Sequence, residues 1–214
     1  MKIATGLIAL ALGLASAGRT DPIAPEVTAP GARMPGTSIG ISLGVGGGVT
    51  NYTGSEMSNA AGVGGAYELR ATIGTRLFLA GEVAYIGSRR NIDTSNVNGV
   101  FGGSPHIFSN GLEGALRVQV PMYAGAWMIE PFAFGGLGWT HFGTDEVISS
   151  SELKSSDDVL VVPFGGGISA AWNGLFLEGR FTYRPVFNED LMVRAGNTAS
   201  LNNWSAGALV GYEF

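Results

Sequence analysis

The last eleven residues alternate between two kinds of side chain, and this alternation constrains the fold more than any other stretch of the chain. The even-numbered residues are apolar, with aromatic residues near both ends: Trp204, Ala206, Ala208, Val210, Tyr212 and Phe214. The odd-numbered residues between them are small or polar, except for Leu209. A period of two places alternate side chains on opposite faces of a β-strand. An apolar face with aromatic flanks is typical of a barrel strand that contacts lipid, although a soluble edge strand has the same period.

Segments of this kind recur along the chain and predict eight strands. Their ranges are Thr37–Thr50, Ala61–Ile73, Thr75–Ile86, Gly111–Val120, Ala126–His141, Val159–Trp172, Gly174–Phe187 and Asn203–Phe214. Three connections are tight: around Gly74, over Pro121–Gly125, and at the hairpin dipeptide Asn173-Gly174. The other four are long: Asn51–Ala60, Gly87–Asn110, Phe142–Asp158 and Asn188–Asn202. We therefore predict an all-β fold, an eight-stranded antiparallel up-and-down transmembrane β-barrel with short periplasmic turns and long extracellular loops.

The first residues predict export. Lys2 precedes a short apolar core, Leu7–Leu14, and Ala15-Ser16-Ala17 is a small-residue cleavage site. We expect residues 1–17 to be a cleaved signal peptide, with a retained N-terminal anchor as the alternative. Four prolines in residues 18–36 predict an extended periplasmic leader, so the barrel domain is placed at 37–214. The chain has no cysteine and therefore no disulfide.

Composition narrows the class of protein. Only 14% of residues are charged, yet outside the signal no apolar run is long enough for a membrane-spanning helix. Glycine is abundant, at 35 of 214 residues, which fits many short strands better than helices. The net charge of −5 argues against a nucleic-acid partner, which would require a basic face. A soluble sandwich or barrel is the alternative to the membrane fold.

Aromatic residues recur near the ends of the apolar faces, as in the girdles of membrane barrels. In the fifth predicted strand Trp127 and Trp139 are twelve residues apart, which is about 30 Å of height for a strand tilted by about 40°. That height matches the hydrocarbon layer of a bilayer. We expect the girdle to comprise Tyr85, Trp127, Trp139, Trp172, Tyr183, Trp204 and Tyr212.

Charged residues concentrate on the opposite, inward faces. The predicted lumen charge network comprises Glu68, Arg70, Arg76, Glu82, Glu113, Arg117, Glu130, Glu178, Arg180 and Arg184. Charges inside a narrow barrel must pair, and the planar guanidinium group binds a carboxylate through two hydrogen bonds. The network is either a plug that fixes the strands or a gate, and the small width of an eight-stranded barrel favours the plug. Bulges are expected at Pro131 and Pro163, because a proline lacks a ladder donor.

The end of the chain also resembles the C-terminal assembly signal of bacterial outer-membrane barrels, on five positions: Ser205, Gly207, Val210, Tyr212 and Phe214. Together with the strand pattern, residues 37–214 resemble the eight-stranded outer-membrane barrels of the OmpA transmembrane-domain and OmpX type. The resemblance implies location in the bacterial outer membrane and contact with its lipid and lipopolysaccharide. It also implies insertion by the barrel-assembly machinery, a monomer, and no cofactor.

Some small outer-membrane barrels are lipid A-modifying enzymes, so the histidines and the acidic residues of this chain are candidates for catalytic or metal sites. The lipid A deacylases carry His-x-Ser-Asn on a strand, whereas this chain has His106-Ile107-Phe108-Ser109-Asn110. That spacing places His106 and Ser109 on opposite faces of a strand, so we predict no catalytic residue. His141 fits the outer girdle. The acidic residues Asp145, Glu146, Glu152, Asp157 and Asp158 predict a solvated loop rather than a metal site.

These patterns predict an outer-membrane protein with a structural or surface-interaction role and four displayed loops. Those loops are rich in Ser, Asn, Thr and Gly, which suits an extracellular ligand without naming one. A narrow channel for ions or small solutes is the first alternative, and a lipid A-modifying enzyme is the second.

Overall fold

The computed structural model describes residues 39–54, 58, 62–91, 106–144, 156–187, 193–194, 197–198 and 201–214. The predicted signal peptide and leader lie outside these residues, as do most of the four long connections. Within the described residues, no helix has the length and hydropathy needed to cross a membrane.

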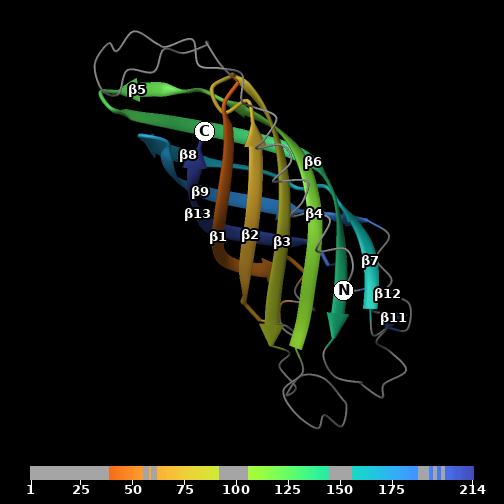
Figure 1. The fold of residues 1–214 in the computed structure, drawn as a ribbon. Helices are drawn as coiled ribbons and strands as arrows, with labels where there is room; N and C mark the ends of the chain where they lie inside the picture. The colour runs from red at the N-terminus through yellow and green to blue at the C-terminus, as the bar shows by residue number, and fades with distance from the viewer. Residues whose placement is uncertain are drawn as a thin grey trace.

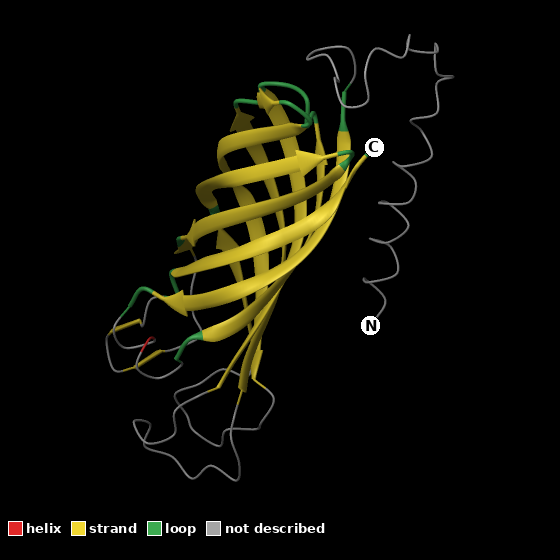
Figure 2. Cartoon of the chain, turned by 90° about the vertical axis from the view of Figure 1, so that its left-hand side faces the viewer, coloured by secondary structure: helices red, strands yellow, loops and turns green. Residues whose placement is uncertain are grey.

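The described chain is a closed antiparallel β-barrel (Figures 1 and 2). Its strands are β1 (Ile41–Tyr52), β2 (Gly64–Ile73), β3 (Leu79–Asn91), β4 (His106–Gln119), β5 (Met122–Ala124), β6 (Trp127–Thr144), β7 (Ser156–Val161), β8 (Phe164–Trp172), β9 (Leu175–Arg184), β10 (Val186–Phe187) and β13 (Asn203–Glu213). A separate hairpin joins β11 (Val193–Arg194) to β12 (Asn197–Thr198). Because β5 continues β4, β8 continues β7 and β10 continues β9, the barrel has eight staves, and β13 pairs with β1 to close it. The predicted eight-stranded fold is confirmed.

Three tight turns lie at one end of the barrel, which we call the turn end; the other is the loop end. Asn173 and Gly174 both have positive φ, at 52° and 84°, as a two-residue hairpin turn requires. Gly74 and Gly125 also have positive φ, which glycine adopts without a steric penalty. The second turn is reached only after β5, at residues 125–126, slightly later than the predicted Pro121–Gly125.

The longest predicted loop, Gly87–Asn110, is shorter in the structure. Strand β3 continues to Asn91 and β4 already begins at His106, and the two strands pair along this whole length. The polar run Ser88-Arg89-Arg90-Asn91 suggested a loop, but polar residues suit both faces of a ladder that extends beyond an apolar band. Arg90 is therefore a strand residue and faces inward, with only 3% of its surface exposed.

The bulges predicted at Pro131 and Pro163 are wrong. The register is the same on either side of each proline, so no extra residue is inserted. Each proline still accepts a ladder bond: Val120 N–H donates to the Pro131 carbonyl at 3.1 Å, and Gly136 N–H to the Pro163 carbonyl at 2.9 Å. A proline therefore removes one donor here and does not shift the faces.

Aromatic rings cover several glycines on the inner wall. A Cβ added at Gly44 would lie 2.8 Å from the Phe176 ring, and one at Gly167 would lie 2.7 Å from the Phe132 ring. Glycine thus provides the room that lets large rings lie against the backbone inside a narrow lumen. These inner glycines are in this way part of the packing.

The closing seam between β1 and β13 is rich in glycine. Gly44 faces Gly211, and Gly48 faces Gly207, so these positions have no cross-strand side-chain pair. The last residue still joins the ladder, because Phe214 N–H donates to the Ile41 carbonyl at 2.8 Å. Backbone hydrogen bonds therefore hold the middle of this seam.

Candidate functional site in the barrel lumen

A layer of buried charge crosses the middle of the lumen. We call it the charge layer and define it as Glu68, Arg70, Glu82, Arg117, Glu178 and Arg180. Arg117 Nη1 lies 2.6 Å from Glu178 Oε2 and 3.2 Å from Glu82 Oε1. Arg180 Nη2 lies 2.8 Å from Glu82 Oε1, and its Nε donates to Glu178 at 2.9 Å. Arg70 contacts the same two carboxylates at 3.3 and 3.4 Å.

Three arginines thus share Glu82 and Glu178, and Glu68 pairs with Arg70 to complete the balance of charge. The strand order places β3 and β9 on opposite sides of the barrel, because they lie four staves apart in a barrel of eight. The bonds between Arg180 on β9 and Glu82 on β3 therefore cross the full width of the lumen.

Two aromatic rings complete the charge layer. The Arg117 guanidinium carbon lies 3.7 Å from the centre of the Phe132 ring, and that of Arg180 lies 4.1 Å from the Phe134 ring. Both distances are within the range of cation–π attraction. The sequence places both rings on the inner face of β6, but gives no sign that they contact the arginines.

Towards the loop end, Arg184 forms a second ion pair. Its Nε donates to Glu113 Oε1 at 2.6 Å, its Nη2 to Glu113 Oε2 at 3.2 Å, and its Nη1 to Ser205 Oγ at 2.6 Å. Each nitrogen of the guanidinium group therefore has a partner. This pair joins β9 to β4 and to β13 just above the charge layer.

Arg90 lies closer still to the loop end and differs from the other inner arginines. Its Nη2 donates to Thr50 Oγ1 at 2.6 Å, and its guanidinium carbon lies 3.8 Å from the centre of the Tyr52 ring. Its Nε and Nη1 are buried without a hydrogen-bond partner. Among the described residues, no carboxylate pairs with it. The sequence places Arg90 in a loop, so this residue is absent from the predicted network.

At the turn end, polar side chains form hydrogen bonds and an ion pair that link the tight turns to the neighbouring strands. Arg76 lies in the turn between β2 and β3 rather than on a strand, and its Nε lies 2.5 Å from Glu213 Oε1. Gln119 Nε2 donates to the carbonyls of Gly74, Thr75 and Leu77 at 3.2, 2.9 and 2.9 Å. Glu130 is buried above them, and its Oε1 has no hydrogen-bond partner.

Two cavities flank the charge layer in the described part of the barrel. The one at the turn end has about 20 Å³ open to the centre of a water molecule and is lined by Arg117, Glu130 and Glu178, among others. The one towards the loop end has about 60 Å³ and is lined by Glu68, Arg90 and Arg180, among others. On this measure a water needs about 10–15 Å³, so each cavity is large enough for at least one water.

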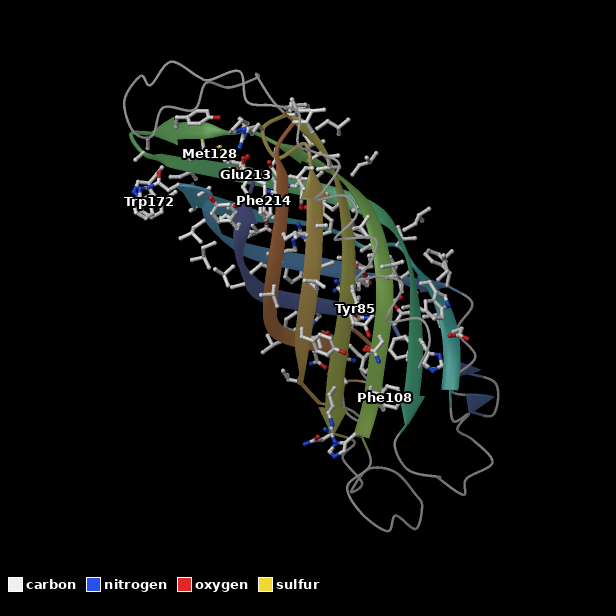
Figure 3. The ribbon with its side chains drawn as sticks, viewed as in Figure 1. Tyr85, Phe108, Met128, Trp172, Glu213 and Phe214 are labelled. Atoms are coloured by element: carbon white, nitrogen blue, oxygen red, sulfur yellow. The ribbon has the colours of Figure 1, made fainter. Side chains whose placement is uncertain are left out.

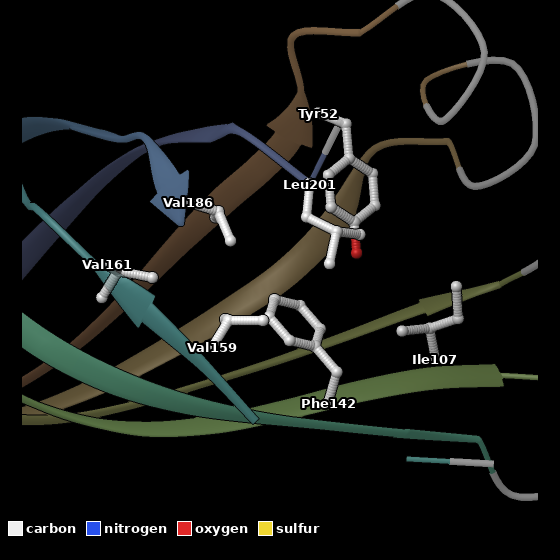
Figure 4. Close-up of a cluster of buried hydrophobic side chains, with 7 residues drawn as sticks. All are labelled: Tyr52, Ile107, Phe142, Val159, Val161, Val186 and Leu201. Atoms are coloured by element: carbon white, nitrogen blue, oxygen red, sulfur yellow. The ribbon is translucent and has the colours of Figure 1, made fainter. Parts of the chain in front are cut away.

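An apolar cluster closes the inner wall at the loop end (Figure 4). Its members are Tyr52, Ile107, Phe142, Val159, Val161, Val186 and Leu201. They come from β1, β4, β6, β7, β10 and the segment before β13, so side chains from all around the barrel meet there. The sequence alternation assigns several of them to the inner face, but it does not show that they converge.

The predicted girdle residues lie on the outer face at both ends of the barrel. Trp127 and Trp172 flank neighbouring tight turns, and their rings stack with centres 6.2 Å apart. In Figure 3 Trp172 and Phe214 share the turn end, whereas Tyr85 lies further towards the loop end. Trp204, Tyr183, Trp139 and Tyr85 form the second group, and Tyr212 belongs to the first.

The five residues of the predicted assembly signal divide between the two faces of β13. Val210, Tyr212 and Phe214 are exposed on the outside, Phe214 by 63%. Ser205 and Gly207 face the lumen, where Ser205 bonds Arg184. The Tyr212 and Phe214 rings meet edge to face with centres 5.2 Å apart.

His106 and Ser109 lie three residues apart on β4, so their side chains leave opposite faces. Ser109 Oγ lies 2.8 Å from Ser88 Oγ, and His141 Nδ1 lies 2.8 Å from Asp158 Oδ1 on the outer face. The predicted acidic residues Asp145, Glu146 and Glu152 lie outside the described residues, as does the Asp157 side chain. No cluster of potential metal ligands occurs among the residues that are described.

No protein-family model matches the sequence. No curated protein matches it either. Solved structures do match. Ail, the attachment invasion locus protein of Yersinia pestis, solved in complex with the heparin analogue sucrose octasulfate, is 12% identical, with a TM-score of 0.50 over 83% of this chain and all of that one. The N-terminal barrel domain of Pseudomonas aeruginosa OprF is 11% identical, with a TM-score of 0.49 over 82% of this chain and 97% of that one. The likeness to Ail, at this identity, shows the fold: a small outer-membrane β-barrel.

Proposed function

We propose that this chain is an integral outer-membrane barrel with a closed lumen, which serves a structural or surface-interaction role. The observation that carries the proposal is the bridge from Arg180 to Glu82, which spans opposite strands with a small cavity on either side. A layer that is internally neutral and packed on Phe132 and Phe134 holds the staves together and blocks a continuous water path. The apolar cluster at the loop end adds a second obstruction.

The outer surface of the barrel and the sequence both support a location in the outer membrane. Large apolar side chains cover the outside of the barrel, as in Leu116 and Leu137, each 63% exposed, and only a lipid surround gives them an apolar partner. The export signal and the C-terminal assembly pattern support delivery by the barrel-assembly machinery. On this proposal the barrel is a monomer in lipid and lipopolysaccharide, takes no cofactor, and offers its loops to an extracellular ligand.

Whether the lumen is closed is tested by measuring both the conductance and the stability of a charge-layer variant. Arg117→Ala removes one of three shared cations and leaves Glu82 and Glu178 short of a partner, so it lowers the free energy of unfolding by on the order of 3 kcal/mol. The wild type and the variant are compared in planar bilayers and by melting in detergent. Arg89→Ala is the matched control, because Arg89 faces outward on β3.

For a plug, we expect Arg117→Ala to melt earlier while conductance stays near zero. The cavities on both sides of the layer favour a second candidate, a gated narrow channel for ions or small solutes. In that case the variant would conduct severalfold more than the wild type. If neither property changes, the charge layer does not close the lumen and the proposal fails.

Location is tested at the C-terminus. Deletion of Phe214 removes an exposed outer aromatic residue and the final ladder bond to Ile41. We expect the truncated chain to be degraded in the periplasm, with much less protein in outer-membrane fractions. Phe187→Ala, which changes an outer aromatic residue elsewhere, is the control. Undiminished surface levels of the truncated chain would contradict assembly through this signal.

A further inference from the structure

The loop-end cavity, unlike the charge layer, has an excess of positive charge. The charged residues that line it are Arg90, Arg180, Arg184 and Glu68, three cations against one anion. Arg180 and Arg184 have carboxylate partners, whereas Arg90 has none among the described residues. A buried cation without a counterion is costly, and among the described residues that line this cavity Arg90 is the cation without one.

The unused donors of Arg90 are the second observation. Its Nε and Nη1 carry three N–H groups, all buried without an acceptor. Thr140 lines the same cavity, and its hydroxyl is likewise buried without a hydrogen-bond partner among the described residues. A water molecule or an ion can satisfy buried donors of this kind. Several donors that lack an acceptor favour a ligand with several acceptor atoms.

The position of Arg90 is built into the fold. Its side chain lies across Gly64 on β2 and reaches Thr50 on β1, and a Cβ at Gly64 would collide with Arg90 Cγ. The Tyr52 ring covers the other side of the guanidinium group at 3.8 Å. The cation is therefore held in place before any ligand arrives, which reduces the entropy lost on binding.

We propose that the loop-end cavity binds a small inorganic oxyanion of the sulfate or phosphate type, through Arg90 and the hydroxyl of Thr140. The hydroxyls of Ser88, Ser109 and Ser205 line the same space and offer further donors. About 60 Å³ of this cavity is open to the centre of a water molecule, several times the 10–15 Å³ that one water needs, so the cavity has room for a small tetrahedral oxyanion. This site is independent of whether the lumen conducts and of where the barrel resides.

Sulfate is the probe, and the refolded full-length barrel is the sample. The chain is refolded with and without sodium sulfate, so that the anion need not enter through a closed lumen. The melting temperature is then followed over a sulfate titration, with ionic strength held constant by sodium chloride. We expect a saturable rise for the wild type and for Arg89→Gln, the outward-facing neighbour. For Arg90→Gln the apparent affinity should fall by at least about tenfold.

Two further arms make the outcome decisive. Selenate, which replaces sulfate in crystals, should give an anomalous difference peak within hydrogen-bond distance of Arg90. Glucose 1-phosphate should not raise the melting temperature, and tighter binding of the sugar phosphate would instead identify a lipid headgroup as the ligand and overturn the inorganic assignment. If Arg90→Gln does not fold, Thr140→Val keeps the cation and should weaken sulfate binding severalfold. No saturable response in the wild type, or an unchanged response in the folded variants, would overturn the proposal.

Discussion

The charge layer and the loop-end cavity hold the same residue type in opposite circumstances. In the layer, Arg117 shares two carboxylates with two other arginines and lies 3.7 Å from an aromatic ring centre. One cavity further towards the loop end, Arg90 is equally buried, donates to the Thr50 hydroxyl and contacts a ring, but it pairs with no carboxylate in the described part of the chain. Among the described residues, the charges of the layer cancel, whereas those that line the cavity do not.

The difference shows that burial alone does not define the role of a charged side chain. A buried ion network contributes mainly through the penalty that follows when one member is removed. An unpaired buried cation already carries such a penalty, so its removal costs little and a bound anion gains much. The layer is therefore suited to holding strands together, and the cavity to binding.

The largest effect is expected at the centre of the charge layer. Glu82→Ala leaves Arg70, Arg117 and Arg180 with one shared carboxylate and should lower the free energy of unfolding by on the order of 4 kcal/mol. Urea titration in lipid vesicles measures it. Val83→Ala, the next residue along β3 on the outer face, is the control and should cost well under half as much. Equal costs for the two variants would show that the layer does not stabilise the barrel.

An intermediate effect is expected where the backbone makes room for Arg90. Gly64→Ala places a methyl group against Arg90 Cγ and 2.6 Å from the Arg89 carbonyl oxygen, which should cost about 1–3 kcal/mol by overpacking. Gly65→Ala is the matched control, because a Cβ there meets nothing within 4 Å. Thermal melting separates them. If both are tolerated alike, Arg90 is not held across Gly64.

The smallest effect is expected from Arg90 itself. Arg90→Met removes a buried charge together with one hydrogen bond and one ring contact, so the two contributions offset each other to within about 1 kcal/mol. Arg117→Met, the same change in the charge layer, should cost about 3 kcal/mol. Chemical denaturation of both variants makes the comparison directly. A loss at Arg90 as large as that at Arg117 would remove the distinction between the two regions.

The sequence predicts the parts of the fold that depend on local periodicity. Alternation assigns Val83 and Leu177 outward and Glu82 and Glu178 inward, because successive side chains in a strand leave opposite faces. Asn173-Gly174 identifies a turn because both residues tolerate positive φ. The candidate charged residues follow from the same alternation, and all of them except Arg76, which lies in a turn, are on the inner face of a strand.

What the sequence could not provide depends on the closure of the barrel. Glu82 and Arg180 are 98 residues apart, and only the stave order places them opposite each other. The sequence predicts a loop at Arg90, because the polar neighbours of this residue hide the end of β3. The contact of Phe132 with Arg117 likewise depends on how far neighbouring strands are offset, which alternation does not encode.

The glycine pairs at the closing seam have a consequence for how the barrel opens. The pairs Gly44–Gly211 and Gly48–Gly207 have no side chains, and between them only Val45–Val210 brings two side chains together, whereas two large rings stack at Trp127–Trp172. A strand pair that is held mainly by backbone hydrogen bonds opens more readily by thermal fluctuation than one that also packs large side chains. We expect amides of β1 and β13 to take up deuterium before those of β4 and β6. On this expectation β1 and β13, the strands that the assembly machinery must join last, would also be the first to separate.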